Sequence, residues 1–157
     1  MKVGDQGKAL FREWEGVLPH MYLDSGGAPT IGIGHLLTQP ERASGQLWLR
    51  GQAVSYGEGL TLADCDALLE QDLEPVQQCV NSGVTVALTQ NQFDALVSFA
   101  FNVGNDAFLN STLLKRLNAG RLDDVPAEFA RWNRDNNRVV QGLVNRRQKE
   151  IALWLQA

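Results

Sequence analysis

Two carboxylates and a hydroxyl group near the start of the chain have the types and spacing that acid–base chemistry requires. Glu15 is followed by Asp24 nine residues later and by Thr30 six residues after that. Cleavage of a glycosidic bond needs one carboxylic acid to protonate the leaving oxygen and a second carboxylate to activate water or stabilise charge. Taken singly, Glu15 also fits the surface of an amphipathic helix, and Asp24 fits a turn, because Ser25-Gly26-Gly27 follows it.

Glu15 occupies the end of a predicted helix. Asp5 can cap this helix, and Gly16 can end it, so Glu15 lies in the last turn. A carboxylate in that place meets the negative end of the helix dipole, and its neighbours Phe11 and Trp14 offer partial burial. Both effects favour the protonated form that a general acid needs.

The helical period disappears from residue 20 to residue 35, where the pattern favours a β-hairpin. A glycine-rich turn separates residues 21–24 from residues 30–35. Asp24 then ends the first strand and Thr30 begins the second. We expect both side chains to face one cleft with Glu15.

The second strand of this hairpin has two different faces. Alternation places Ile31 and Ile33 on an apolar face, and it leaves Thr30, Gly32 and Gly34 on a face that is nearly bare. A bare strand face leaves room for a ligand.

Helical periodicity returns after residue 60. Thr61 and Asp64 can open a long helix, which Pro75 should bend. A capping box, Thr89–Gln92, precedes the next helix, for which Gly104 is the stop. The remaining predicted helices cover residues 111–118, 124–132 and 142–155, and residues 36–59 are predicted to be irregular with one short helix.

Length and composition predict a single globular domain with an α+β, mostly helical fold. The chain has 157 residues, of which 44% are hydrophobic and 20% charged. The predicted parts are a hairpin-containing part over residues 1–60, a connecting helix over 61–81 and an all-helical part over 82–157. Cys65 and Cys79 lie about 21 Å apart in the connecting helix, too far for a disulfide.

Together, Glu15, Asp24, Thr30 and the run TIGIGHLLT over residues 30–38 resemble glycoside hydrolase family 24, which contains the T-even phage lysozyme. The resemblance extends to residues 68–72, 99–104 and 142–150, and the last segment is similar to lambdoid phage endolysins. It implies a two-lobed, lysozyme-like fold with a small hairpin lobe, a long connecting helix and an all-helical lobe.

The resemblance also implies a muramidase, which cleaves the β-1,4 bond between N-acetylmuramic acid and N-acetylglucosamine in peptidoglycan. Glu15 would be the general acid, and Asp24 and Thr30 would hold the attacking water. Inversion at the anomeric carbon would require roughly 6.5 to 9.5 Å between the two carboxyl groups. Two alternatives stay open: a lytic transglycosylase that uses Glu15, and a non-catalytic wall-binding or scaffold module of a phage tail or secretion apparatus.

His35 has a structural interpretation in the same framework. Asp72 falls among the apolar positions of the connecting helix, where an unpaired charge would be costly. By resemblance Asp72 pairs with His35 and ties the hairpin to that helix.

Other residues are expected near the substrate. The predicted cleft residues are Gly32, Gly34, Leu36, Phe108, Arg138 and Arg147. Arg138, Arg146 or Arg147 could reach Glu15 or the glycan, or could belong to a solvated helix end. Trp48, in the irregular region, is the tryptophan that most favours a surface contact.

Charge and composition exclude several classes of function. The net charge of −4 argues against the excess of basic residues that nucleic-acid binding requires. The two histidines and two cysteines form no recognised ligand set, so we expect no metal and no cofactor.

The start of the chain contains no apolar run that would form a signal peptide or a membrane span. We therefore expect a monomer made in the host bacterial cytoplasm, which acts on the periplasmic cell wall after release or export. The expected partners are bacterial peptidoglycan and, for release or control, a holin or an immunity or inhibitor protein.

Overall fold

The computed structural model describes residues 1–156, and it confirms an α+β fold that is mostly helical. The chain forms two compact units. The sheet unit is Ala9–Glu74, and the helical unit combines Met1–Lys8 with the chain from Pro75 onward. These bounds differ from the predicted parts, because the first eight residues belong with the later helices and the boundaries fall inside helices α1 (Asp5–Glu15) and α3 (Leu62–Gly83).

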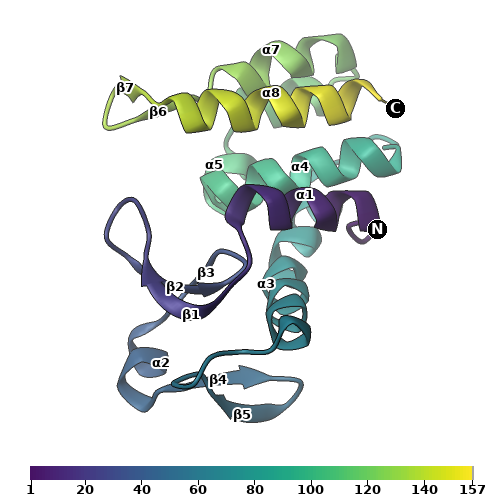
Figure 1. Cartoon of the computed structure of the whole chain (residues 1–157). Coiled ribbons are helices and arrows are strands. Elements are labelled where there is room, and N and C mark those ends of the chain that lie inside the picture. Colours follow the sequence, from purple (N-terminus) through teal and green to yellow (C-terminus); the bar gives the residue numbers. More distant parts are fainter. Residues whose placement is uncertain (157) are drawn as a thin grey trace. The chain divides into compact units, whose positions relative to one another are not determined.

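The sheet unit contains a three-stranded antiparallel sheet in the order β1 (Leu18–Leu23), β2 (Pro29–Gly32) and β3 (His35–Leu36) (Figure 1). The predicted hairpin is therefore confirmed for its first two strands. The continuous return strand predicted over residues 30–35 is wrong, because the backbone turns at Gly32-Ile33-Gly34. Gly32 and Gly34 have φ values of 68° and 70°, in the left-handed region that glycine adopts readily, so β3 folds back on β2.

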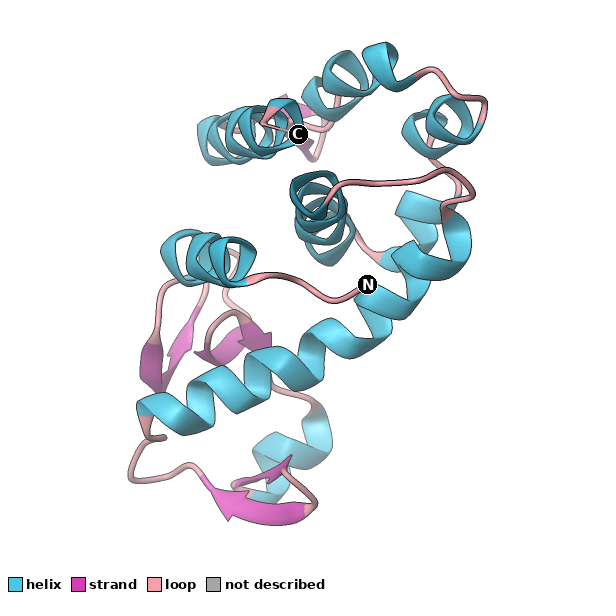
Figure 2. Cartoon of the chain, turned by 90° about the vertical axis from the view of Figure 1, so that its right-hand side faces the viewer, coloured by secondary structure: helices cyan, strands magenta, loops and turns pink. Residues whose placement is uncertain are grey.

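The region predicted to be irregular contains the expected short helix, α2 (Gln39–Ser44), but also an unpredicted hairpin, β4 (Gln46–Leu49) with β5 (Gln52–Ser55) (Figure 2). Its turn has positive φ at Arg50 and Gly51, as two-residue hairpin turns require. Leu47 and Leu49 are buried on one face, and Trp48 is 62% exposed on the other.

Helix α3 confirms the predicted connecting helix. The Thr61 hydroxyl accepts a hydrogen bond from the Asp64 amide, and the Asp64 carboxylate accepts one from the Thr61 amide. This reciprocal cap begins the helix as predicted. Pro75 lies inside the helix, and both Cys65 and Cys79 are free thiols.

The helical unit is built around α4 and α8, which lie side by side (Figure 1). The predicted capping box at Thr89 is present. Three other predicted helices are confirmed, and each of their ends lies within two residues of the predicted one. Helix α5 and the short hairpin β6–β7 were not predicted. The elements are α4 (Gln90–Val103), α5 (Asn105–Leu109), α6 (Thr112–Asn118), η1 (Leu122–Asp124), α7 (Val125–Ala130), β6 (Arg134–Asp135), β7 (Arg138–Val139) and α8 (Gln141–Leu155).

An aromatic cluster forms the core of the helical unit. The Phe99 ring meets Phe108, Phe129 and Trp132 edge-on, at centroid distances of 6.3, 5.4 and 5.4 Å. Such contacts stabilise a core beyond the area that they bury. Trp154 joins the cluster through Phe129, as expected for a core tryptophan.

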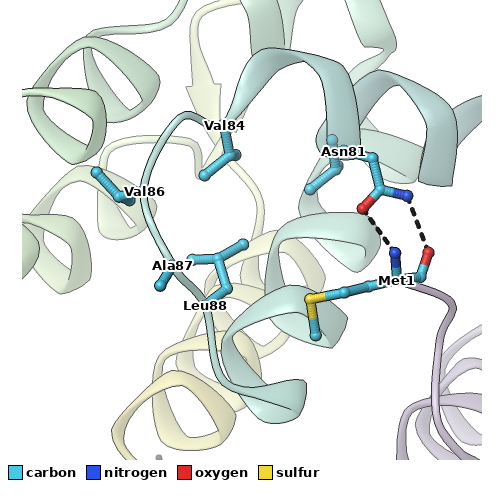
Figure 3. Close-up of a pocket in the computed structure, with 7 residues that line it drawn as sticks. Met1, Asn81, Val84, Val86, Ala87 and Leu88 are labelled. Carbon is cyan, nitrogen blue, oxygen red and sulfur yellow. Dashed lines mark hydrogen bonds between the residues drawn. The ribbon is translucent and has the colours of Figure 1, made fainter.

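The first four residues are held by side chains of the helical unit. The Met1 amine donates a hydrogen bond to the Asn81 side chain, whose amide donates one back to the Met1 carbonyl, beside a pocket of about 330 Å³ (Figure 3). The Val3 amide donates to Gln77 at 2.7 Å, and the Gly4 amide donates to Asp94 at 3.2 Å. The prediction that Asp5 caps α1 is wrong: Gly4 precedes the helix, and the cap carboxylate comes from Asp94 of α4.

The net charge is divided unevenly between the two units. The sheet unit holds three basic and ten acidic residues, a net of −7, and the helical unit holds eleven basic and eight acidic residues, a net of +3. The acidic total of the chain therefore belongs to the sheet unit. None of the helices in residues 1–156 combines the length and apolar character that crossing a membrane requires.

Candidate active site

Glu15 ends α1 and turns its carboxyl group toward Gly34. A β-carbon at Gly34 would lie 2.7 Å from Glu15 Oε2 and 2.9 Å from its carboxyl carbon. Real β-carbons do not come this close, so a side chain at this position would displace the Glu15 carboxyl group from where it lies. The sequence predicts that Gly34 leaves one face of the strand without a side chain. In the structure, the Glu15 carboxyl group lies against this glycine.

Asp24 occupies the turn between β1 and β2. Its Oδ1 accepts hydrogen bonds from the amides of Gly26, at 2.9 Å, and Ala28, at 2.8 Å. This is the turn-forming use of an aspartate that the sequence suggested. The same bonds fix the orientation of the carboxylate, and Oδ2 has no hydrogen bond within residues 1–156.

Thr30 faces the same turn from β2. It is only 2% exposed, and its hydroxyl donates to the Ala28 carbonyl at 2.9 Å. Because the hydroxyl hydrogen of Thr30 is already donated to the Ala28 carbonyl, its oxygen can only accept a hydrogen bond from another group.

Tyr22 is a site residue that the sequence interpretation missed. It pairs with Thr30 across the β1–β2 ladder and precedes Asp24 by two residues. Burial raises the pKa of the Tyr22 phenol above its usual value, and the negative charges of Glu15 and Asp24 raise it further. The tyrosine therefore lies within the electrostatic reach of both predicted catalytic carboxylates. The alternation of strand residues around Asp24 and Thr30 was the signal that could have identified it.

His35 and Asp72 form the predicted pair, with Nδ1 of the histidine 2.8 Å from Oδ2 of the aspartate. A partner that was not predicted, Glu41, lies 3.0 Å from His35 Nε2. Burial opposes the charged imidazole, but the hydrogen bonds and charges of the two carboxylates outweigh it and raise the pKa of His35 to about 9. The histidine is thus a charged bridge that joins β3, α2 and α3.

The remaining predicted cleft residues differ in their exposure and in the residues around them. Gly32 is directed at α3, since a β-carbon there would meet Leu68 at 3.5 Å. Leu36 is 58% exposed on β3, and Arg138 is exposed on β7. Phe108 is fully buried in the aromatic core, so its predicted exposure to substrate is wrong.

Arg147 is also buried, which argues against its predicted place in the cleft. Its Nε lies 2.7 Å from Oε1 of Glu150, and its guanidinium donates to Asn102 and stacks over Phe99. Glu150 is fully buried and accepts a short hydrogen bond from Ser98. The arginine is therefore used to neutralise a buried carboxylate between α4 and α8.

Two pockets among the described residues are lined by none of the predicted catalytic residues. One is the pocket beside Met1, and the other, of about 270 Å³, is lined by Thr112, Glu128, Arg131 and Trp132. Within residues 1–156, no three histidine, cysteine or acidic side chains gather closely enough to hold a metal ion.

Comparison with known proteins gives one family. The family model described as phage lysozyme matches residues 12–150. The endolysin of Bacillus phage PZA is 39% identical over 98% of this chain and 55% of its own length. The endolysin of Salmonella phage P22 is 35% identical over 99% of both chains. The chain thus spans about half of the first relative and nearly all of the second.

A solved structure shares the fold as well as the sequence. The muramidase domain of SpmX from Asticaccaulis excentricus is 35% identical, with a TM-score of 0.79 over 98% of this chain and 97% of that domain.

Proposed function

The chain belongs to the phage lysozyme family, and from that premise we propose that Glu15, Asp24 and Thr30 hydrolyse the glycan strands of bacterial peptidoglycan. The membership confirms the predicted class, a lysozyme-type glycoside hydrolase. We assign to it the β-1,4 bond between N-acetylmuramic acid and N-acetylglucosamine, whose cleavage lyses the cell wall.

Glu15 is assigned as the general acid. It is the last residue of α1, so its carboxyl group lies at the carboxyl end of that helix. Gly34, which has no side chain, leaves the space that this carboxyl group occupies. A proton held there can pass to the glycosidic oxygen as the bond to the anomeric carbon breaks.

The attacking water is assigned to Asp24 and Thr30, and their hydrogen bonds are the observation that carries this proposal. Asp24 Oδ1 is occupied by two backbone amides, which leaves Oδ2 to accept a proton from water. The Thr30 oxygen, whose own proton goes to Ala28, can accept the second water hydrogen. A water held by two acceptors keeps a lone pair for the anomeric carbon.

The reaction then balances without a cofactor. The water oxygen bonds to the anomeric carbon, one water proton passes to Asp24, and the Glu15 proton passes to the leaving oxygen. Attack opposite the leaving group inverts the anomeric centre, so the first product is the α-anomer.

The experiment is release of reducing ends from purified peptidoglycan. Glu15→Gln and Asp24→Asn should each lower turnover by at least roughly 100-fold, the scale of lost acid or base catalysis. Glu58→Gln and Asp123→Asn, which remove exposed carboxylates elsewhere, are the matched controls. A Glu15→Gln protein that clears walls at the wild-type rate would refute the assignment.

Product analysis separates hydrolysis from its alternatives. Mass spectrometry of the digest should find reducing ends, whereas anhydro-sugar ends would establish a transglycosylase. Proton NMR during the first minutes should detect the α-anomer, and a β-anomer would reject inversion. Binding to the wall with no product would establish a non-catalytic module.

We further propose that the enzyme reaches the wall after release from the cytoplasm, through a holin or under the control of an immunity or inhibitor protein. The positive charge of the helical unit would favour contact with anionic wall polymers. Wall binding should therefore weaken when the salt concentration is raised from about 50 to about 200 mM, because salt screens the attraction between exposed charges.

A further inference from the structure

Trp48 differs from the other tryptophans of the chain in what surrounds its ring. Each of the other three packs edge-on against a phenylalanine, in the pairs Trp14–Phe11, Trp132–Phe99 and Trp154–Phe129. Trp48 is 62% exposed, and no aromatic ring or cation of residues 1–156 stacks on it. The indole is therefore accessible to a ligand that has an apolar face.

The backbone that carries Trp48 is held in place by its neighbours. Leu47 and Leu49, on either side of it in β4, are each 1% exposed and anchor the opposite face of the hairpin. Gln71 of α3 donates a hydrogen bond to the Trp48 carbonyl at 2.8 Å. The exposed ring thus stands on an ordered element, so a ligand would not have to order the backbone in order to bind.

The side chains around the indole are small or polar, and none is charged. Ala53 is the cross-strand partner of Trp48, and Gln46 and Ser55 form the next pair along the same face of the β4–β5 hairpin (Figure 1). All four residues are exposed, and the side chains of Gln46, Trp48 and Ser55 make no hydrogen bond to other parts of residues 1–156. These four residues, the Trp48 face, combine an apolar ring with an unused amide and an unused hydroxyl group.

Charge limits the ligands that fit the Trp48 face. The only charged residue of the hairpin, residues 46–55, is Arg50, which forms an ion pair with Asp64 of α3. A basic partner would therefore find no carboxylate on the hairpin itself. The net charge of −7 on the sheet unit disfavours the anionic parts of a cell wall, such as peptide carboxylates and phosphate groups. The Trp48 face thus fits an uncharged ligand.

We propose that the Trp48 face binds uncharged sugar rings of a glycan strand, as a second contact with the polymer in addition to the proposed active site. The choice of polymer rests on the proposed function. One side of an N-acetylglucosamine ring consists of C–H groups and can lie flat on the indole, while the hydroxyl and acetamido groups at its edge can bond to Gln46 and Ser55. Two contacts with one strand keep the enzyme on an insoluble polymer between cleavage events.

The first test measures binding of the Glu15→Gln protein to sedimented peptidoglycan. Adding Trp48→Ala should weaken this binding roughly tenfold, the scale of one lost aromatic contact together with its buried area. Trp48→Phe keeps an aromatic face and should recover most of the affinity. Leu155→Ala removes an apolar side chain that is 67% exposed in the helical unit, and it should bind like the Glu15→Gln protein alone. Equal affinity with and without Trp48→Ala would overturn the proposal.

A soluble probe tests the chemistry of the ligand. Tetramers of N-acetylglucosamine carry no charge, and they should change the fluorescence that is lost in Trp48→Phe to the same extent at about 50 and about 200 mM salt. A change that disappears at the higher salt concentration, or its absence at both, would reject an uncharged sugar as the ligand.

The two proposals fail in different ways. Trp48-dependent binding by a Glu15→Gln protein that still releases reducing ends would reject Glu15 as the acid and support the Trp48 face. Undiminished binding by Trp48→Ala, in a Glu15→Gln protein without turnover, would reject the Trp48 face and support the acid.

Discussion

His35 donates through Nδ1 to Asp72 Oδ2 at 2.8 Å, and this ion pair joins β3 to α3 within the sheet unit. The side chains are only 12% and 20% exposed. Glu41 completes the bridge from α2, where it also caps its own helix by accepting from the Thr38 amide. The strand that follows Gly34 is therefore held by charges as well as by its ladder.

His35→Asn should lower stability and preserve turnover. The substitution leaves Asp72 and Glu41 close together without the cation between them, which costs about 3 kcal/mol or more for a largely buried network. Urea unfolding should detect this loss, while kcat on peptidoglycan stays near that of wild type. His20→Asn, at an exposed histidine, is the control. Lost turnover with unchanged stability would instead make His35 part of the chemistry.

The same bridge predicts a pH dependence of stability. The pKa of His35 is about 9 in the folded chain and about 6.5 when unfolded. Because the folded value is raised, the contribution is fully present below pH 6.5 and is lost as pH rises through 9. The difference in unfolding free energy between wild type and His35→Asn should shrink by about 3 kcal/mol between pH 6 and pH 10. A constant difference would contradict a charged histidine.

Gly34→Ala should damage catalysis more than stability. Its β-carbon would contact the Glu15 carboxyl, and its backbone φ of 70° would be strained by roughly 1 kcal/mol. Gly45→Ala shares the φ of 70° but meets no atom within 4 Å, so it reproduces the strain alone. We expect similar losses of melting temperature and at least a tenfold greater loss of kcat for Gly34→Ala. Equal kcat values would show that Glu15 does not need this space.

Thr30→Val should separate the hydroxyl from the shape of the side chain. The isosteric valine cannot accept from water, so kcat should fall by roughly 100-fold, as for a lost polar contact at a reacting centre. Losing the bond to Ala28 should cost only about 1 kcal/mol of stability. Thr30→Ser keeps the hydroxyl and should recover most of the rate. If valine and serine are equally active, Thr30 has no part in holding the water.

Arg147→Met tests whether this arginine is structural. Removing it leaves the buried Glu150 carboxylate without its nearest cation, which should cost about 3 to 5 kcal/mol. The exposed Arg134→Met is the control. Replacing Glu150 by Met as well should recover part of the lost stability. A stable Arg147→Met protein with a raised KM would restore its predicted place in the cleft.

Elements with local signals were predicted well. The Thr89 capping box and the Thr61–Asp64 pair are bonds between near neighbours in the chain, so their sequence spacing is enough to indicate them. The β4–β5 hairpin was missed because each strand has only four residues, too few for a clear alternation. The break after β2 was missed because a glycine fits a strand or a turn equally well until its φ is known.

The site residues also differ in whether the sequence alone could identify them. Glu15, Asp24 and Thr30 were selected by residue type and spacing, and their roles still depend on experiment. Tyr22 has no distinguishing motif, and only the register opposite Thr30 and the charges around its phenol single it out.

By itself the sequence determined the family, the mostly helical α+β class and the three candidate catalytic residues, because these follow from residue types at short, regular spacing. Only the tertiary structure decided that Glu41 joins the His35–Asp72 pair, that Gly34 makes room for Glu15, and that Phe108 and Arg147 are buried. Burial, ion pairing and close approach depend on which distant segments meet, and a linear spacing does not carry that information.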